Sequence, residues 1–181
     1  MLFMKKLSTS FLLLLMSITG SLVAQDTVHD KLKEELIKDW ERARGYTKSF
    51  LDAMPADKYS WQPTQEVRSF AKQMLHLAYI NVGWMRLGTD QNDFPKGMNA
   101  QSQIEETVPQ TKDSVSYYAM ASYDLAIEKL KKMDASKLFE MTRGNASHLT
   151  WIKRAFEHQT HQRAQCVTYL RLVGIKPPHT L

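Results

Sequence analysis

The strongest constraint on the fold is helical periodicity, because apolar residues recur at three- and four-residue steps over long stretches. In the first stretch, from about Thr27 to Ala53, the repeat consists of Leu32, Leu36, Trp40 and Ala43. Such a repeat places its apolar side chains along one face of an α-helix. Pro55 follows, and proline cannot continue a helix because it has no backbone N–H. The stretch therefore predicts one amphipathic helix that ends before Pro55.

Two further helices are predicted in the middle of the chain. The first begins near Ser69, whose side chain can cap free backbone N–H groups, and ends near Gly88. The next spans about Lys112 to Met133. Between them, residues 89–110 form a long polar connection, and a loop of this size in a small bundle is often functional or mobile.

The last part of the chain completes the pattern. A short segment, Ser136–Met141, is expected to direct Leu138 and Phe139 towards the core. The fourth helix is predicted from Ser147 to Val173, where Gly174 stops it. Seven glycines and six prolines are few for 181 residues, so a turn-rich β fold has little support. The sequence therefore predicts an all-α, up-down four-helix bundle.

The beginning of the chain has the layout of a secretory signal peptide. Lys5 and Lys6 precede an apolar stretch, Phe11 to Val23, and Ala24 precedes the polar pair Gln25-Asp26. The alternative is an uncleaved membrane anchor, although the stretch is short for a span of about 20 residues. Cleavage is favoured, with Ala24 as the last residue removed.

This interpretation gives a signal peptide at residues 1–24 and one exported domain at residues 25–181, periplasmic or secreted, with no membrane segment after cleavage. The net charge of +5 includes the leader's two lysines, so the mature chain carries an ordinary +3. No Lys/Arg cluster is interleaved with aromatic residues, so a nucleic-acid partner has no support. Cys166 is the only cysteine, which excludes an intrachain disulfide and favours a buried structural thiol over a nucleophile.

Histidines are the residues best placed to carry chemistry. His76 and His158 lie at the edges of the apolar stripes of the second and fourth helices. At about 100° per residue, Gln162 points the same way as His158, whereas His161 points towards the opposite surface. Bundle cores commonly build metal sites from side chains on facing helices. The alternative is that each histidine is an ordinary hydrogen-bonded residue, and no catalytic residue is assigned because no phosphate loop or nucleophile elbow occurs.

Two segments resemble signatures of the DinB/YfiT-like superfamily. The first is Tyr59-Ser60-Trp61-Gln62-Pro63-Thr64, followed by Val67-Arg68-Ser69-Phe70 and His76. The second is Glu157-His158-Gln159-Thr160-His161-Gln162-Arg163-Ala164-Gln165, which continues to Tyr169-Leu170-Arg171. The resemblance implies a four-helix bundle, often a homodimer, with a three-histidine site for a divalent metal such as zinc or nickel. Some relatives are thiol-dependent S-transferases, others look like hydrolases or isomerases, and many have no known activity.

Carried over by position, His76 and His158 match two of the family's three metal ligands, and Gln162 stands where the third histidine is usual. An amide oxygen is a poorer zinc ligand than imidazole, so the affinity for metal should be lowered or the site lost. One hypothesis is an exported metal-dependent transferase or hydrolase with Gln162 or water completing the metal shell. The other is a non-catalytic bundle that has lost its metal and binds a small molecule or dimerises.

Overall fold

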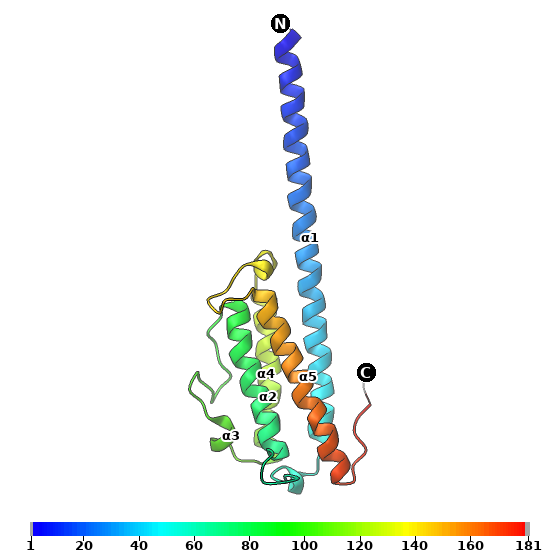
Figure 1. Ribbon diagram of the computed structural model, residues 1–181, viewed down its shortest axis with the longest axis vertical. Coiled ribbons are helices and arrows are strands. Elements are labelled where there is room, and N and C mark those ends of the chain that lie inside the picture. Colours follow the sequence, from blue (N-terminus) through cyan, green and yellow to red (C-terminus); the bar gives the residue numbers. More distant parts are fainter. Residues whose placement is uncertain (1, 180–181) are drawn as a thin grey trace.

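The computed structural model describes the backbone of residues 2–179 and the side chains of residues 28–179. Its elements follow in the order α1 (Leu2–Ala53), η1 (Ala56–Lys58), α2 (Phe70–Thr89), α3 (Ile104–Thr107), α4 (Lys112–Lys132), η2 (Ala135–Phe139) and α5 (His148–Leu172). The four long helices pack side by side, and the first part of α1 projects far beyond the bundle (Figure 1). The predicted all-α four-helix bundle is confirmed.

The direction of the helices differs at one place from simple up-down alternation. Near the starts of α2 and α4, the Ser69 hydroxyl donates to Gln110 Oε1 at 2.5 Å. Near their ends, Gln91 Nε2 donates to the Lys129 carbonyl at 3.0 Å, and Lys129 Nζ donates to the Gln91 carbonyl. The two helices therefore run parallel, and residues 90–111 cross back along the length of the bundle between them (Figure 1).

Capping side chains set the helix boundaries where the sequence predicts them. Ser69 accepts a hydrogen bond from the Lys72 backbone N–H at 3.2 Å, and Ser147 caps α5 in the same way. After α5, Gly174 adopts a φ of +79°, a left-handed conformation that glycine reaches without steric cost. Local chemistry therefore explains where these helices begin and end.

Helix α1 begins earlier than predicted. It ends at Ala53 as expected, but it starts at Leu2 and continues without a break through the predicted cleavage site. The leader's side chains lie outside the described residues, so the signal peptide stays a prediction. Among the described residues, no helix combines the length and the apolar character that crossing a membrane requires.

Buried side chains from all four long helices form one core. The largest fully buried side chains include Trp40, Phe50, Tyr59, Phe70 and Tyr123. Cys166 is also fully buried, as predicted, and this burial raises the pKa of its thiol far above the ordinary value. Burial keeps the thiol protonated, which suits a structural residue and not a nucleophile.

The short segment before α5 corrects one prediction. Leu138 in η2 is fully buried, as expected, but Phe139 is 56% exposed and does not enter the core. The reason is that η2 is a 3-10 turn, in which successive side chains point about 120° apart.

This difference can be tested with a matched pair of variants. We expect Leu138→Ala to lower the free energy of unfolding by about 2–5 kcal/mol, because it opens a cavity in the core. Phe139→Ala should change it by no more than about 0.5 kcal/mol. Urea denaturation of both variants measures the difference, and equal losses would contradict the described packing.

Candidate metal-binding site

Helices α2 and α5 bring the two predicted histidines together. His76 lies on α2 and His158 on α5, and the centroids of their rings are 5.2 Å apart with the ring planes at 60°. The ring of Trp84 packs edge-on against His158, with centroids 5.1 Å apart. Two imidazoles from facing helices thus share one partly buried place between α2 and α5.

The surroundings of His158 keep its imidazole neutral. Burial lowers the pKa of His158 to about 4, and the positive charge that His76, His161 and Arg68 can carry adds to this effect. Its Nδ1 atom is buried and has no hydrogen-bond partner among the described residues. A neutral imidazole is the form that binds metals, so the His158 ring is in the protonation state that a metal ligand requires.

Gln162 occupies the place that the sequence predicts for it, one turn along α5 from His158. Its Nε2 lies 3.0 Å from His158 Nε2 and donates to it, and its Oε1 accepts a hydrogen bond from Gln73 Nε2. Gln73 also donates to Gln165 Oε1 at 3.0 Å. His161 is exposed, and its Nε2 accepts a hydrogen bond from Gln165 Nε2 at 2.8 Å. Both the nitrogen and the oxygen of the Gln162 amide are therefore hydrogen-bonded to other side chains of the protein.

Glu105 is a member of this cluster that the sequence analysis missed. It lies on α3, and its Oε1 accepts a hydrogen bond from His76 Nδ1 at 2.7 Å, while its Oε2 accepts one from Arg68 Nε at 2.7 Å. Burial favours the protonated acid, but the hydrogen bonds from Arg68 and His76 outweigh it and lower the pKa of Glu105. The only sequence signal for this residue was its position in the long polar connection.

The Glu105 contact fixes the chemistry of the His76 ring. A carboxylate bonded to Nδ1 holds the proton there and leaves a lone pair on Nε2. Metal-binding histidines generally have such a partner on the ring nitrogen that does not bind the metal. His76 is therefore oriented as a histidine that binds through Nε2.

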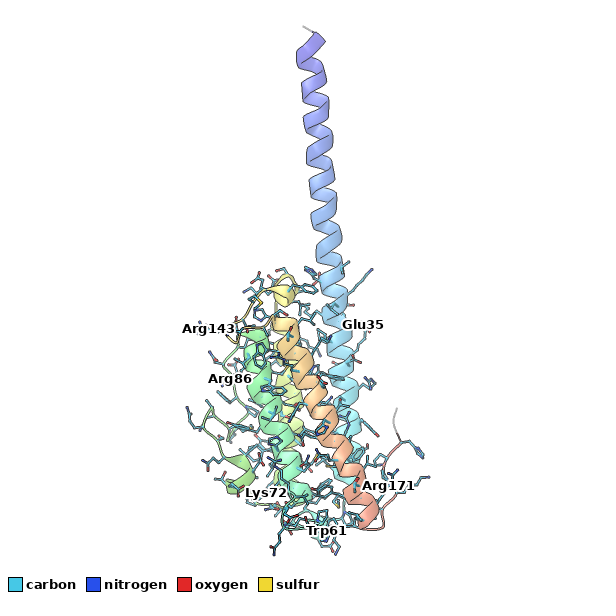
Figure 2. All side chains as sticks on the ribbon, viewed as in Figure 1. Glu35, Trp61, Lys72, Arg86, Arg143 and Arg171 are labelled. Carbon is cyan, nitrogen blue, oxygen red and sulfur yellow. The ribbon has the colours of Figure 1, made fainter. Side chains whose placement is uncertain are left out.

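A cavity of about 810 Å³ opens beside the cluster. Gln73 and Glu105 line both the cluster and the cavity, and Lys72, Gln165 and Tyr169 form other parts of its wall. It lies at the end of the bundle where Trp61 and Lys72 are found, opposite the projecting part of α1 (Figure 2). The cavity and the cluster therefore share Gln73 and Glu105 as common residues.

The donor set fits a metal only in part. Within residues 28–179, no three His, Cys, Asp or Glu side chains are grouped so that they could hold a metal ion by themselves. Two imidazoles are available, and Gln162 or water would have to supply the remaining ligands. Such a set binds zinc or nickel more weakly than three imidazoles do.

Comparisons with known proteins agree on one family. The model of the DinB family matches residues 25–181. A crystal structure of a DinB-like protein from Bacillus cereus ATCC 10987 is similar, with a TM-score of 0.69 and 15% identity over 82% of this chain and 97% of that one. A DinB-like protein from Bacillus subtilis, YjoA, has a TM-score of 0.59 and 15% identity over 81% and 97% of the two chains. No curated protein matches.

The neutral state of His158 leads to a pH prediction. Because its pKa is about 4 when folded and near 6.5 when unfolded, the unfolded chain binds more protons between these values. The contribution of His158 to stability is therefore present above pH 6.5 and is lost as the pH falls to 4. An NMR titration should place the His158 midpoint near 4, with a His158→Gln variant to assign the signal. A midpoint at or above 6.5 would contradict the described environment.

Proposed function

The chain belongs to the DinB family, and we propose that it is an exported member that binds a divalent metal weakly between α2 and α5. His76 and His158 are the metal-binding residues, and Gln162 or water completes the shell. The observation that carries the proposal is the pair of imidazoles 5.2 Å apart, one of them held at Nδ1 by Glu105. Zinc or nickel fits a site of two imidazoles.

The hydrogen bonds of the Gln162 amide limit the affinity of this site for a metal. In the structure its amide nitrogen faces His158 and its oxygen faces Gln73, so its amide must turn over before the oxygen can approach a metal. Turning breaks the hydrogen bond with Gln73, and the amide oxygen gained in exchange is neutral and weakly basic. The cost of this exchange weakens the metal site.

The chemistry that the site supports is thiol transfer or hydrolysis on a small polar molecule. A bound metal would supply a Lewis acid that lowers the pKa of a water or thiol bound to it. The chain's own residues have two tasks: Glu105 orients the His76 ring, and the polar wall of the adjacent cavity admits and positions the substrate. Export argues against a cytosolic low-molecular-weight thiol as that substrate. A homodimer stays a prediction from the resemblance.

One observation favours a second candidate, a non-catalytic bundle that has lost its metal. The hydrogen bonds that join Gln73, Gln162, Gln165 and His158 occupy the Gln162 amide and His158 Nε2 without any metal, and only His158 Nδ1 lacks a partner among the described residues. A cluster whose amides are already paired with one another can serve as the wall of a binding site for a small polar molecule. The two candidates differ in whether the unmodified chain retains metal.

The deciding experiment measures metal in the purified, untagged full chain by mass spectrometry, beside a Gln162→His variant. Near-stoichiometric metal in the unmodified chain would support the metal-dependent function. Metal in the variant alone would favour the non-catalytic bundle. Metal in neither would show that His76 and His158 do not form a metal site. Lys153→His, which adds a histidine at an exposed position of α5, controls for non-specific binding.

Glu105 provides a second test. We expect Glu105→Gln to weaken zinc binding by about 10–100-fold, because the neutral amide no longer holds the His76 proton at Nδ1. The neighbouring Glu106 pairs with Lys72 at 2.6 Å and does not contact the histidines, so Glu106→Gln is a matched control. Zinc binding is measured by calorimetry with both variants made in the Gln162→His background, because the third imidazole raises the affinity enough for the loss to be measured. Similar losses in both variants would show that the effect is general electrostatics and not the Glu105–His76 contact.

A further inference from the structure

A second cavity lies on another face of α5, between α5 and α1. Its volume is about 330 Å³, and Tyr46, Phe50, Phe156 and Val167 give it mainly apolar walls. Arg163 and Arg42 also line it, and no acidic residue does. The cavity therefore combines apolar surface with positive charge, and it shares no lining residue with the cavity beside the histidines.

Arg163 is the notable residue of this cavity, because it is only 6% exposed. Its Nη1 donates to Thr47 Oγ1 at 3.1 Å and to Gln159 Oε1. Its guanidinium carbon lies 4.8 Å from the centroid of the Tyr46 ring, in cation–π contact. These contacts hold the side chain in one orientation at the cavity wall.

No negative charge among the described residues compensates Arg163. Thr47 and Gln159 are neutral, and burial raises the pKa of Tyr123, whose hydroxyl donates to Gln159 Oε1. No carboxylate of residues 28–179 forms an ion pair with the guanidinium, although twelve other pairs of a Lys, Arg or His side chain with an Asp or Glu side chain occur there. Arginine stays charged in proteins, and a buried charge without a partner is costly.

The free side of the guanidinium is available to a ligand. Only Nη1 has hydrogen-bond partners within residues 28–179, which leaves the N–H groups of Nε and Nη2 unpaired on a side chain that lines the cavity. That edge matches the two oxygens of a carboxylate in a bidentate arrangement. Arg42, at the rim, already pairs with Asp39 at 2.9 Å, so the attraction for an anion comes mainly from Arg163.

We propose that this cavity binds an organic monocarboxylate with a short apolar tail. The carboxylate pairs with Arg163, and the tail lies against Phe50, Phe156 and Val167. A single uncompensated guanidinium suits one negative charge, and the apolar walls exclude a small hydrated anion as the preferred ligand. The small volume excludes a long-chain lipid.

The test uses octanoate as the probe and octanamide as a neutral molecule of nearly the same shape, each titrated into the purified full chain by calorimetry. We expect octanoate to bind at least about tenfold more tightly than octanamide, because only the carboxylate forms a charge-assisted pair with Arg163. Equal affinities, or no octanoate binding to the folded chain, would overturn the proposal.

Three variants locate the binding site without removing Arg163. Ala164 is exposed at the cavity rim, so Ala164→Trp should fill the cavity and weaken octanoate binding by at least about tenfold. Lys153→Trp places the same bulk on an exposed position outside the cavity, and His76→Ala alters only the other site; both should keep the affinity. Unchanged binding in Ala164→Trp, or loss in His76→Ala, would place the anion elsewhere and refute this assignment.

Discussion

The packing of α2 against α5 is the interaction on which both the bundle and its candidate metal site depend. At one end, Gly88 lies so close to α5 that an added Cβ would meet Ile152 Cγ1 at 2.9 Å. At the other end, the Tyr169 hydroxyl donates to the Arg68 carbonyl at 2.6 Å. With the two helices held at both ends, His76 and His158 between them have little freedom to separate. A wider spacing would leave two independent histidines and no shared site.

Two groups of charges lie in this frame, one partly buried around His76 and one buried around Arg163, and they differ in how charge is balanced. Around His76, the carboxylate of Glu105 takes hydrogen bonds from both Arg68 and His76, so positive and negative groups are paired. Around Arg163, every hydrogen-bonding partner is neutral. A balanced cluster is stable as it stands and orients a ligand, whereas an unbalanced buried cation attracts a counter-charge. This contrast is the physical reason for assigning different ligands to the two cavities.

The side chain at position 162 has two separate roles, one in the packing of α5 and one in the proposed metal site. Gln162, which stands where the resemblance places the family's third histidine, is buried between α2 and α5. Its amide joins Gln73 and His158 through hydrogen bonds that a metal-binding histidine would not make in the same way. The fold depends on size and burial at this position, whereas the affinity for metal depends on the identity of the donor atom.

The sequence by itself determined the four long helices, the caps of α2 and α5 and the place of His76 and His158 on those two helices, because periodicity, Ser69, Ser147 and Gly174 act through neighbours a few residues away. Only the tertiary structure decided which distant groups complete each site. Glu105 reaches His76 from 29 positions along the chain, and Arg163 is buried through Thr47, 116 positions away. Such contacts arise from how α1 and the connection formed by residues 90–111 pack on the other helices, and local sequence patterns carry no signal of that packing.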